Sequence, residues 1–301
     1  MQTKDQEDNF KWRYWFRIPV LIRAVISGVL LATAGTIPWA WFVSLNAKYW
    51  SAFPWAIFPT AIYLWIFWQF VRGETWPSST SELRQKNLRA RNLPGKVWEA
   101  SIIAGILGLI TITIFQSLLN RMARLPQQSL AELSHMPVLT LFLLIVMSAF
   151  VAGIVEETAF RGYMQGPIER KHGAVFAILF SGFLFGLVHF THPEVSMILM
   201  PFYMAVAAVY GTIAYLTNSI LPGMMLHTGG NILAGIGLLF GGQSEWQASP
   251  VTKPLIWESG TDSSFWISCL VFILMTIATV RAYKSLAAVV REDHETLVND
   301  V

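Results

Sequence analysis

Long apolar segments alternate with short polar ones along almost the whole chain. The hydrocarbon core of a bilayer is about 30 Å thick, and an α-helix needs about 20 apolar residues to cross it. Segments of about this length recur eight times, and most of the charged residues lie between them. We therefore predict an all-α, polytopic integral membrane protein of about eight transmembrane helices. The expected spans are Ile18–Val43, Pro54–Val71, Val97–Leu119, Val138–Phe160, Ala174–Phe190, Ile198–Leu216, Leu221–Phe240 and Phe265–Val280.

The composition agrees with this pattern and excludes several classes of protein. The chain is 54% hydrophobic and only 13% charged, which excludes an ordinary soluble domain. Its formal net charge of +3 and the lack of a basic, aromatic-interleaved patch exclude a nucleic-acid partner. The single cysteine, Cys269, excludes an internal disulfide and a cysteine metal site. The polar start M-Q-T-K-D-Q-E-D-N has no apolar core with a cleavage site, so we expect no removable signal peptide.

The distribution of Lys and Arg predicts the orientation of the chain. Short cytoplasmic loops carry an excess of these residues. With the N-terminus inside, the inner segments contain 15 of the 21 Lys and Arg residues and the outer segments contain 4. Both termini are therefore expected to be cytoplasmic. The most basic loop, residues 72–96, is expected to form either a short surface helix or a loop held near anionic headgroups.

We divide the chain into three sections. Residues 1–137 hold the first three helices and the basic loop, residues 138–240 form a core with a polar site, and residues 241–301 hold an outer loop, the last helix and a charged tail.

Two adjacent carboxylates close the fourth apolar span, in the run G-I-V-E-E-T-A-F-R. An ionised carboxylate in hydrocarbon costs about 2.5 kcal/mol or more, so such a residue is by default a functional-site hypothesis. Glu157 can form an i,i+4 ion pair with Arg161. Glu156 projects about 100° away from Glu157 on a helix and can face a cavity. Alternatively, all three residues form a solvated cluster where the helix ends.

Two of the six histidines lie within or at the edge of apolar spans and need polar partners. His189 follows Phe185 by four residues, and His227 precedes Asn231 by four, so each pair shares a helix face. We expect a polar site buried among helices 4, 5 and 7, with groups suited to acid/base or oxyanion chemistry.

The turn between helices 4 and 5 bears on this geometry. K-H-G at residues 171–173 is a plausible helix stop, with Gly173 after the cap. If both helices reach that turn, Glu156 and His189 lie at equal distances from it and can face each other. Alternatively, Gly166-Pro167 ends the fourth helix earlier.

Three ordered motifs resemble those of the CAAX protease and bacteriocin-processing family, also called CPBP or Abi, which includes type II CAAX prenyl endopeptidases. The motifs are Glu156-Glu157-x-x-x-Arg161, Phe185-x-x-x-His189 and His227-x-x-x-Asn231, and the resemblance covers about Val138–Phe240.

The resemblance implies an intramembrane endopeptidase that hydrolyses a peptide bond through a glutamate-activated water. Glu156 with His189 would hold and deprotonate the water, and His227 with Asn231 would stabilise the oxyanion. Supporting roles fall to Glu157, Arg161 and Phe185. The expected partners are membrane lipid and a membrane-associated, possibly lipidated, peptide or protein.

A zinc site formed by Glu156, His189 and His227 remains an alternative. The spacing does not resemble H-E-x-x-H, and zinc would leave Asn231 without a clear role, so no cofactor is favoured. Two other functions also remain open, namely a transporter or proton relay, and a non-catalytic immunity or scaffold protein. His192 and Glu194 receive no role.

Overall fold

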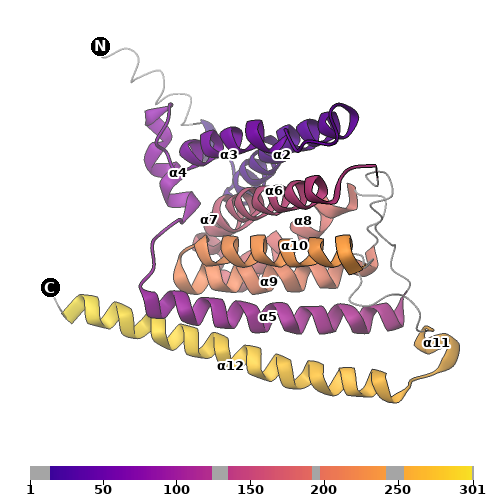
Figure 1. Ribbon diagram of the computed structural model, residues 1–301. Coiled ribbons are helices and arrows are strands. Elements are labelled where there is room, and N and C mark those ends of the chain that lie inside the picture. Colours follow the sequence, from indigo (N-terminus) through magenta and orange to yellow (C-terminus); the bar gives the residue numbers. More distant parts are fainter. Residues whose placement is uncertain (1–13, 124–134, 192–196, 242–253, 300–301) are drawn as a thin grey trace, which may run out of the picture.

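The computed structural model describes residues 14–123, 135–191, 197–241 and 254–299, and each regular element in these ranges is helical (Figure 1). The helices are α2 (Val20–Lys48), α3 (Ile57–Val71), α4 (Ser81–Leu88), α5 (Gly95–Met122), α6 (Val138–Glu156), the π-helical η3 (Glu157–Gln165), α7 (Gly166–His172), α8 (Ala174–Val188), α9 (Met200–Thr217), α10 (Leu221–Gly241), α11 (Ile256–Ser259) and α12 (Ser263–Asn299). Three short 3₁₀ turns complete them: η1 (Ser78–Thr80), η4 (His189–Thr191) and η5 (Met197–Leu199).

Each of the eight predicted apolar spans is a helix, which confirms the all-α polytopic architecture. Within the described residues, six helical stretches are long and apolar enough to cross a membrane, and α3 and α8 are shorter, with 15 residues each. At 1.5 Å per residue, 15 residues extend about 22 Å, less than the hydrocarbon thickness. The fourth span is longer than expected, because α6, η3 and α7 form one continuous helix over Val138–His172.

Proline and glycine mark several helix boundaries. Pro19, Pro94 and Pro137 occupy the N-cap positions of α2, α5 and α6. Gly173 has a φ of 84° directly after α7, which confirms the predicted stop at K-H-G. The alternative break at Gly166-Pro167 does not occur. The helix continues there, and Pro167 lies where the hydrogen bonding changes from π to α.

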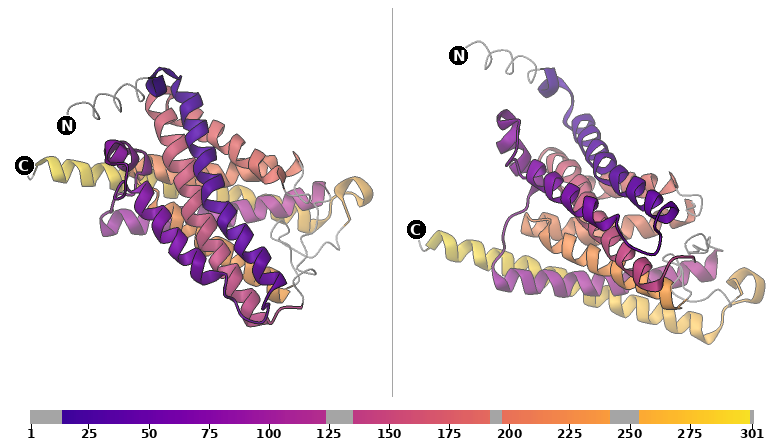
Figure 2. Two further views of the ribbon diagram at one scale, coloured as in Figure 1. Left: turned by 90° about the horizontal axis from the view of Figure 1, so that it is seen from above. Right: turned by 45° about the horizontal axis from the view of Figure 1, so that its top comes forward.

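The helices form stacked layers with the polar core segment in the middle. α12 packs along α5, and above them α9 and α10 lie between α5 and the layer of α6 and α8 (Figure 1). α2 covers α6 and η3, and α3 packs on α2 and α6. Seen from above, α2, α3 and α6 run side by side and cross over α5 and α12 (Figure 2). The continuous helix 138–172 therefore has neighbours on most of its sides.

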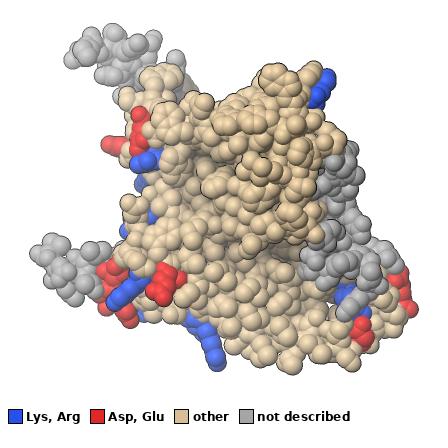
Figure 3. All heavy atoms as spheres, viewed as in Figure 1, with Lys and Arg blue, Asp and Glu red and all other residues tan. Residues whose placement is uncertain are grey.

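Charged residues gather toward the two ends of the helices, with a broad uncharged band between them (Figure 3). The start of α2 and the end of α12 lie at the same end of the bundle (Figure 1). This is the arrangement expected of an integral multi-pass protein, and the cytoplasmic position of that end stays a prediction. The basic loop contains the short helix α4, and two of its arginines, Arg84 and Arg89, are buried within the protein.

Close approach of α6 and α10 depends on small residues, and Gly153 is one of them. A Cβ atom on Gly153 would lie 2.0 Å from Oγ1 of Thr228 and 3.0 Å from the carbonyl oxygen of Met224. Small residues allow helix backbones to approach in this way in membranes. Gly153 therefore sets the spacing of the two helices that carry the candidate site.

We predict that Gly153→Ala lowers the thermal stability of the purified protein, by about 1–3 kcal/mol for an overpacked interface. The matched control is Gly229→Ala on α10, where an added Cβ meets nothing within 4 Å. Thermal unfolding in detergent measures both. Equal unfolding temperatures for the two variants would contradict the close α6–α10 contact.

Candidate functional site

The site centres on Glu157, a carboxylate that is fully buried at the first residue of η3. Its Oε1 accepts a hydrogen bond of 2.8 Å from Nδ1 of His227 and lies 3.1 Å from a guanidinium nitrogen of Arg161. The predicted i,i+4 ion pair is thus present. A Cβ on Gly223 would lie 3.0 Å from Oε2 of Glu157, so α10 passes close to the carboxylate. Glu157 links the fourth and seventh spans directly.

Glu156 lies on the other side of the same imidazole. Its Oε2 is 3.8 Å from Nε2 of His227, and its side chain is 23% exposed, against 1% for Glu157. The distance is too long for a direct hydrogen bond. The two adjacent carboxylates therefore flank one imidazole, Glu157 at Nδ1 and Glu156 at Nε2. Glu156 alone of the two keeps access to the surroundings.

His189 follows α8 directly and stays close to Phe185. Nδ1 of His189 lies 2.7 Å from the Phe185 carbonyl oxygen, so Nδ1–H donates and Nε2 is the acceptor nitrogen of the neutral ring. The Phe185 ring centroid is 4.6 Å from that of His189 and 6.5 Å from that of His227. Phe185 thus contacts both histidines, which brings the second and third motifs together around one aromatic ring.

The guanidinium of Arg161 is buried, and two aromatic faces help to stabilise its charge there. Its Cζ lies 4.7 Å from the centroid of Phe185 and 5.3 Å from that of Tyr210. A guanidinium over an aromatic face is attracted by the negative face of the ring. Together with Glu157, these rings account for an arginine inside an apolar span, and the alternative of a solvated cluster at a helix end is wrong for Glu157 and Arg161, which are 0% and 1% exposed.

Asn231 lies one turn beyond His227 on α10 and is half-buried, on the face predicted from the spacing. His192 and Glu194 lie outside the described residues.

Sequence reasoning missed two tyrosines of α9. The Tyr203 ring stacks on His189 with centroids 4.2 Å apart, and the Tyr210 ring stacks on His227 at 5.1 Å with an interplanar angle of 12°. The sixth span carries no charged residue, so none of the three motifs includes it. Two tyrosines seven residues apart share a helix face, and that spacing was the available signal.

No group of three or more His, Cys, Asp and Glu side chains among the described residues is placed to hold a metal ion. A catalytic zinc needs three protein ligands. Glu156 and His227 supply two of the candidate ligands, and the Nδ1–H of His189 is donated to the Phe185 carbonyl, which leaves Nε2 as the ring nitrogen with a lone pair.

The comparisons with known proteins bear on this segment. Residues 138–233 match the family model described as Type II CAAX prenyl endopeptidase Rce1-like. This segment is similar to the CAAX protease family. The match is about a third of the chain, and it contains all seven of the predicted site residues. It supports a CAAX-type intramembrane endopeptidase in general. No curated protein and no solved structure matches the chain.

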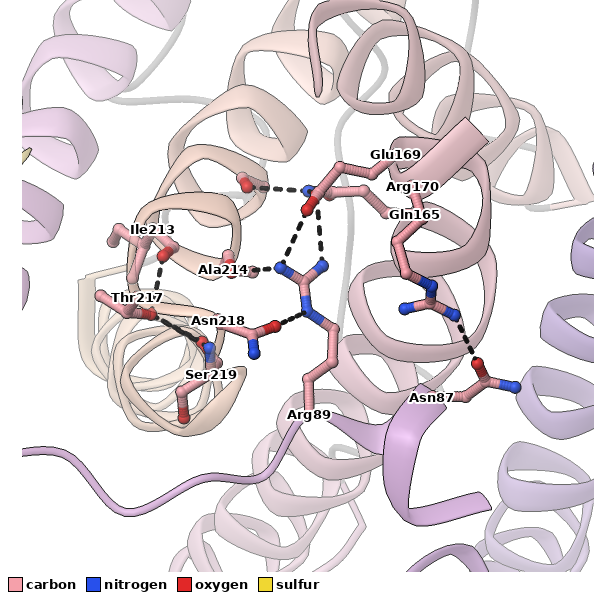
Figure 4. Close-up of polar contacts among 11 residues, drawn as sticks. Asn87, Arg89, Gln165, Glu169, Arg170, Ile213, Ala214, Thr217, Asn218 and Ser219 are labelled. Atoms are coloured by element: carbon pink, nitrogen blue, oxygen red, sulfur yellow. Dashed lines mark hydrogen bonds and ion pairs between the residues drawn. The ribbon is translucent and has the colours of Figure 1, made fainter. Parts of the chain in front are cut away.

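A second polar cluster surrounds the side chain of Arg89 (Figure 4). Arg89 reaches Glu169 with two nitrogens at 3.2 Å each, donates from Nε to Asn218 at 2.9 Å, and donates to the Ala214 carbonyl at 2.6 Å. Gln165 donates to Glu169 at 3.2 Å and to the carbonyl of Gly211 at 2.9 Å. These bonds join the segment after α4 to α7 and α9.

The cluster and the candidate site lie on the same helix. Glu157, Arg161, Gln165 and Glu169 follow one another at intervals of four residues. Gln165 belongs to η3, and its bond to Gly211 of α9 fixes how η3 is rotated against that helix. The cluster therefore helps to orient the segment that carries Glu157 and Arg161.

We predict that Arg89→Met destabilises the protein by about 3–5 kcal/mol, because it leaves the Glu169 carboxylate without its buried partner. The double variant Arg89→Met/Glu169→Met should recover part of the loss. Arg72→Met is the control, since its ion pair with Glu74 at 2.8 Å is solvent-exposed and is worth less than about 1 kcal/mol. Thermal unfolding in detergent measures all three. Equal losses for Arg89→Met and Arg72→Met would show that the cluster does not hold the helices.

Proposed function

We propose that the protein hydrolyses a peptide bond of a membrane-associated peptide or protein, through a water molecule that Glu156 activates. The observation that carries the proposal is the His227 imidazole between two adjacent carboxylates inside the bundle, in the segment that matches the family model.

Glu156 is the proposed general base. It is the more exposed of the two carboxylates, and the 3.8 Å between its Oε2 and Nε2 of His227 leaves both atoms to share a third partner. A water in that position gives one proton to the carboxylate while its oxygen bonds to the carbonyl carbon of the substrate. The second hydrogen of this water is donated to Nε2 of His189, whose Nδ1–H is donated to the Phe185 carbonyl. Nε2 of His227 then contacts the water oxygen only as a donor, in the protonated ring.

The negative charge that develops on the carbonyl oxygen needs donors. The side-chain amide of Asn231 is one donor, and a single such group is worth about 2.7–4 kcal/mol in another hydrolase. His227 donates a hydrogen bond from its Nδ1–H to Glu157, so its Nε2 is a second donor to the oxyanion only when the ring is protonated. The intermediate then collapses, the C–N bond breaks, and the proton held by Glu156 passes to the leaving amine.

We further propose that this hydrolysis needs no metal. The support is the ligand geometry, since Glu156 and His227 lack a third ligand among the described residues. Turnover that survives prolonged treatment with a zinc chelator is the expected result. Loss of turnover on chelation, restored by added zinc, would overturn this part of the proposal.

The substrate class follows from where the site lies. A peptide attached to a lipid is concentrated in the bilayer that surrounds the helices. The matching family model is named for prenyl endopeptidases, so a peptide with a prenylated cysteine near its C-terminus is the first substrate to test.

We predict that Glu156→Gln lowers kcat/KM by at least about a hundredfold, the lower end of what a general base contributes. The control is Glu74→Gln, a solvent-exposed glutamate far from the family segment in sequence. Cleavage of a fluorogenic prenylated peptide in proteoliposomes measures both variants, with the unprenylated peptide beside it.

Three other outcomes would each contradict the proposal in a different way. Turnover by Glu156→Gln equal to that of the wild-type protein would show that Glu156 is not the general base. Ion or proton flux that depends on Glu156, without cleavage, supports a transporter. A cellular phenotype that Glu156→Gln still restores supports a non-catalytic role.

A further inference from the structure

Helix α9 contacts three of the elements that form the candidate site. It packs against α8, which His189 follows, against η3, which carries Glu157 and Arg161, and against α10, which carries His227. It brings no charged side chain of its own. What it brings to the site is two aromatic rings.

Each ring covers one histidine. Tyr203 stacks on His189 with centroids 4.2 Å apart and an interplanar angle of 27°, and Tyr210 stacks on His227 at 5.1 Å and 12°. The tyrosines are 4% and 3% exposed. Seven residues separate them, which is about two turns, or 10.5 Å, along one face of α9. One rigid helix therefore faces two histidines that come from different helices.

A stacked aromatic ring restricts the tilt of an imidazole plane about its hydrogen bond. Nδ1 of His189 lies against the Phe185 carbonyl, and Nδ1 of His227 lies against the Glu157 carboxylate. One hydrogen bond fixes the position of that nitrogen but allows the ring plane to tilt about it. A near-parallel aromatic face opposes that tilt, because stacked rings have a preferred separation and angle. The direction of the opposite nitrogen, Nε2, then becomes defined.

Tyr210 has a second contact that adds to its role. The Arg161 guanidinium lies 5.3 Å from its centroid, so the same ring contacts both Arg161 and His227. These are the two groups that contact the Glu157 carboxylate. A displaced Tyr210 ring would loosen both partners of Glu157 together.

We propose that Tyr203 and Tyr210 are positioning residues, which hold the His189 and His227 imidazoles at the angle that the hydrolysis needs. The inference rests on the proposed function, and it assigns to α9 a role that no motif describes. Neither tyrosine needs its hydroxyl for this role. The planar ring is the functional part.

The test compares three substitutions in the prenylated-peptide assay. Tyr210→Met fills similar space with a flexible chain and removes the planar face, whereas Tyr210→Phe keeps the face and removes the hydroxyl. Tyr215→Met is the matched control, since Tyr215 lies on the same helix and is 46% exposed. Thermal unfolding of each variant is measured alongside kcat and KM.

The proposal predicts that Tyr210→Met lowers kcat by about tenfold to a hundredfold, the scale of a small misplacement of catalytic groups, while KM changes by less than about threefold. Tyr210→Phe and Tyr215→Met should retain kcat within about threefold. If Tyr210→Met does not fold, the pair Tyr203→Met and Tyr203→Phe makes the same comparison at the other stack.

Two results would overturn the inference. One is a Met variant that folds and keeps the wild-type kcat. The other is a Phe variant that falls as far as the Met variant, which would assign the effect to the hydroxyl. Both results leave the proposed hydrolysis intact, because that proposal is tested by cleavage in the wild-type protein and by its loss in Glu156→Gln.

Discussion

A carboxylate without solvent in the middle of a membrane protein must be given partners by the protein itself, and Glu157 is that carboxylate here. Its charge is met by Arg161 on the same helix and by the Nδ1 proton of His227 on α10. Breaking such a buried contact is strongly unfavourable, since water cannot replace the lost partner. The helices must therefore stay close at this level, and Gly153 and Gly223 provide the space. The approach of α6 and α10 and the position of His227 both follow from this requirement.

The two adjacent acids differ in exposure because their side chains leave the helix in different directions. Glu157 is enclosed, whereas Glu156, one residue earlier, keeps 23% of its side chain exposed and faces the other nitrogen of the same imidazole. η3 begins at this point, and each of its nine residues is buried. π-helical turns are rare and occur frequently at functional sites. Farther along, Gln165 and Glu169 connect this segment to α9 and Arg89, so the geometry of the site is supported by this polar cluster as well.

The helices and part of the candidate site could be predicted from the sequence, because these features depend on residues that are close together in the chain. The length of the apolar segments predicts the eight helices, and the i,i+4 spacing predicts the pair of Glu157 and Arg161. The glycine in K-H-G predicts the end of α7. Contacts between distant segments leave no such trace. Arg89 and Glu169 are 80 residues apart, and nothing in the basic loop shows that two of its arginines are buried. The sequence does not predict the aromatic stacks, because tyrosine in an apolar span is ordinary. It does not predict η3, because no residue pattern marks a π-helix. The roles of Glu156, His189, His227 and Asn231 stay predictions.

A double-mutant cycle between Glu157 and His227 tests the central contact most directly. The variants are Glu157→Gln, His227→Asn and both together, and the measured quantity is the free energy of unfolding in detergent. Two groups that share a buried hydrogen bond should show a coupling energy of about 1–3 kcal/mol. A coupling energy within about 0.3 kcal/mol of zero is the value for independent sites, and it would contradict the account of how this bundle holds its carboxylate.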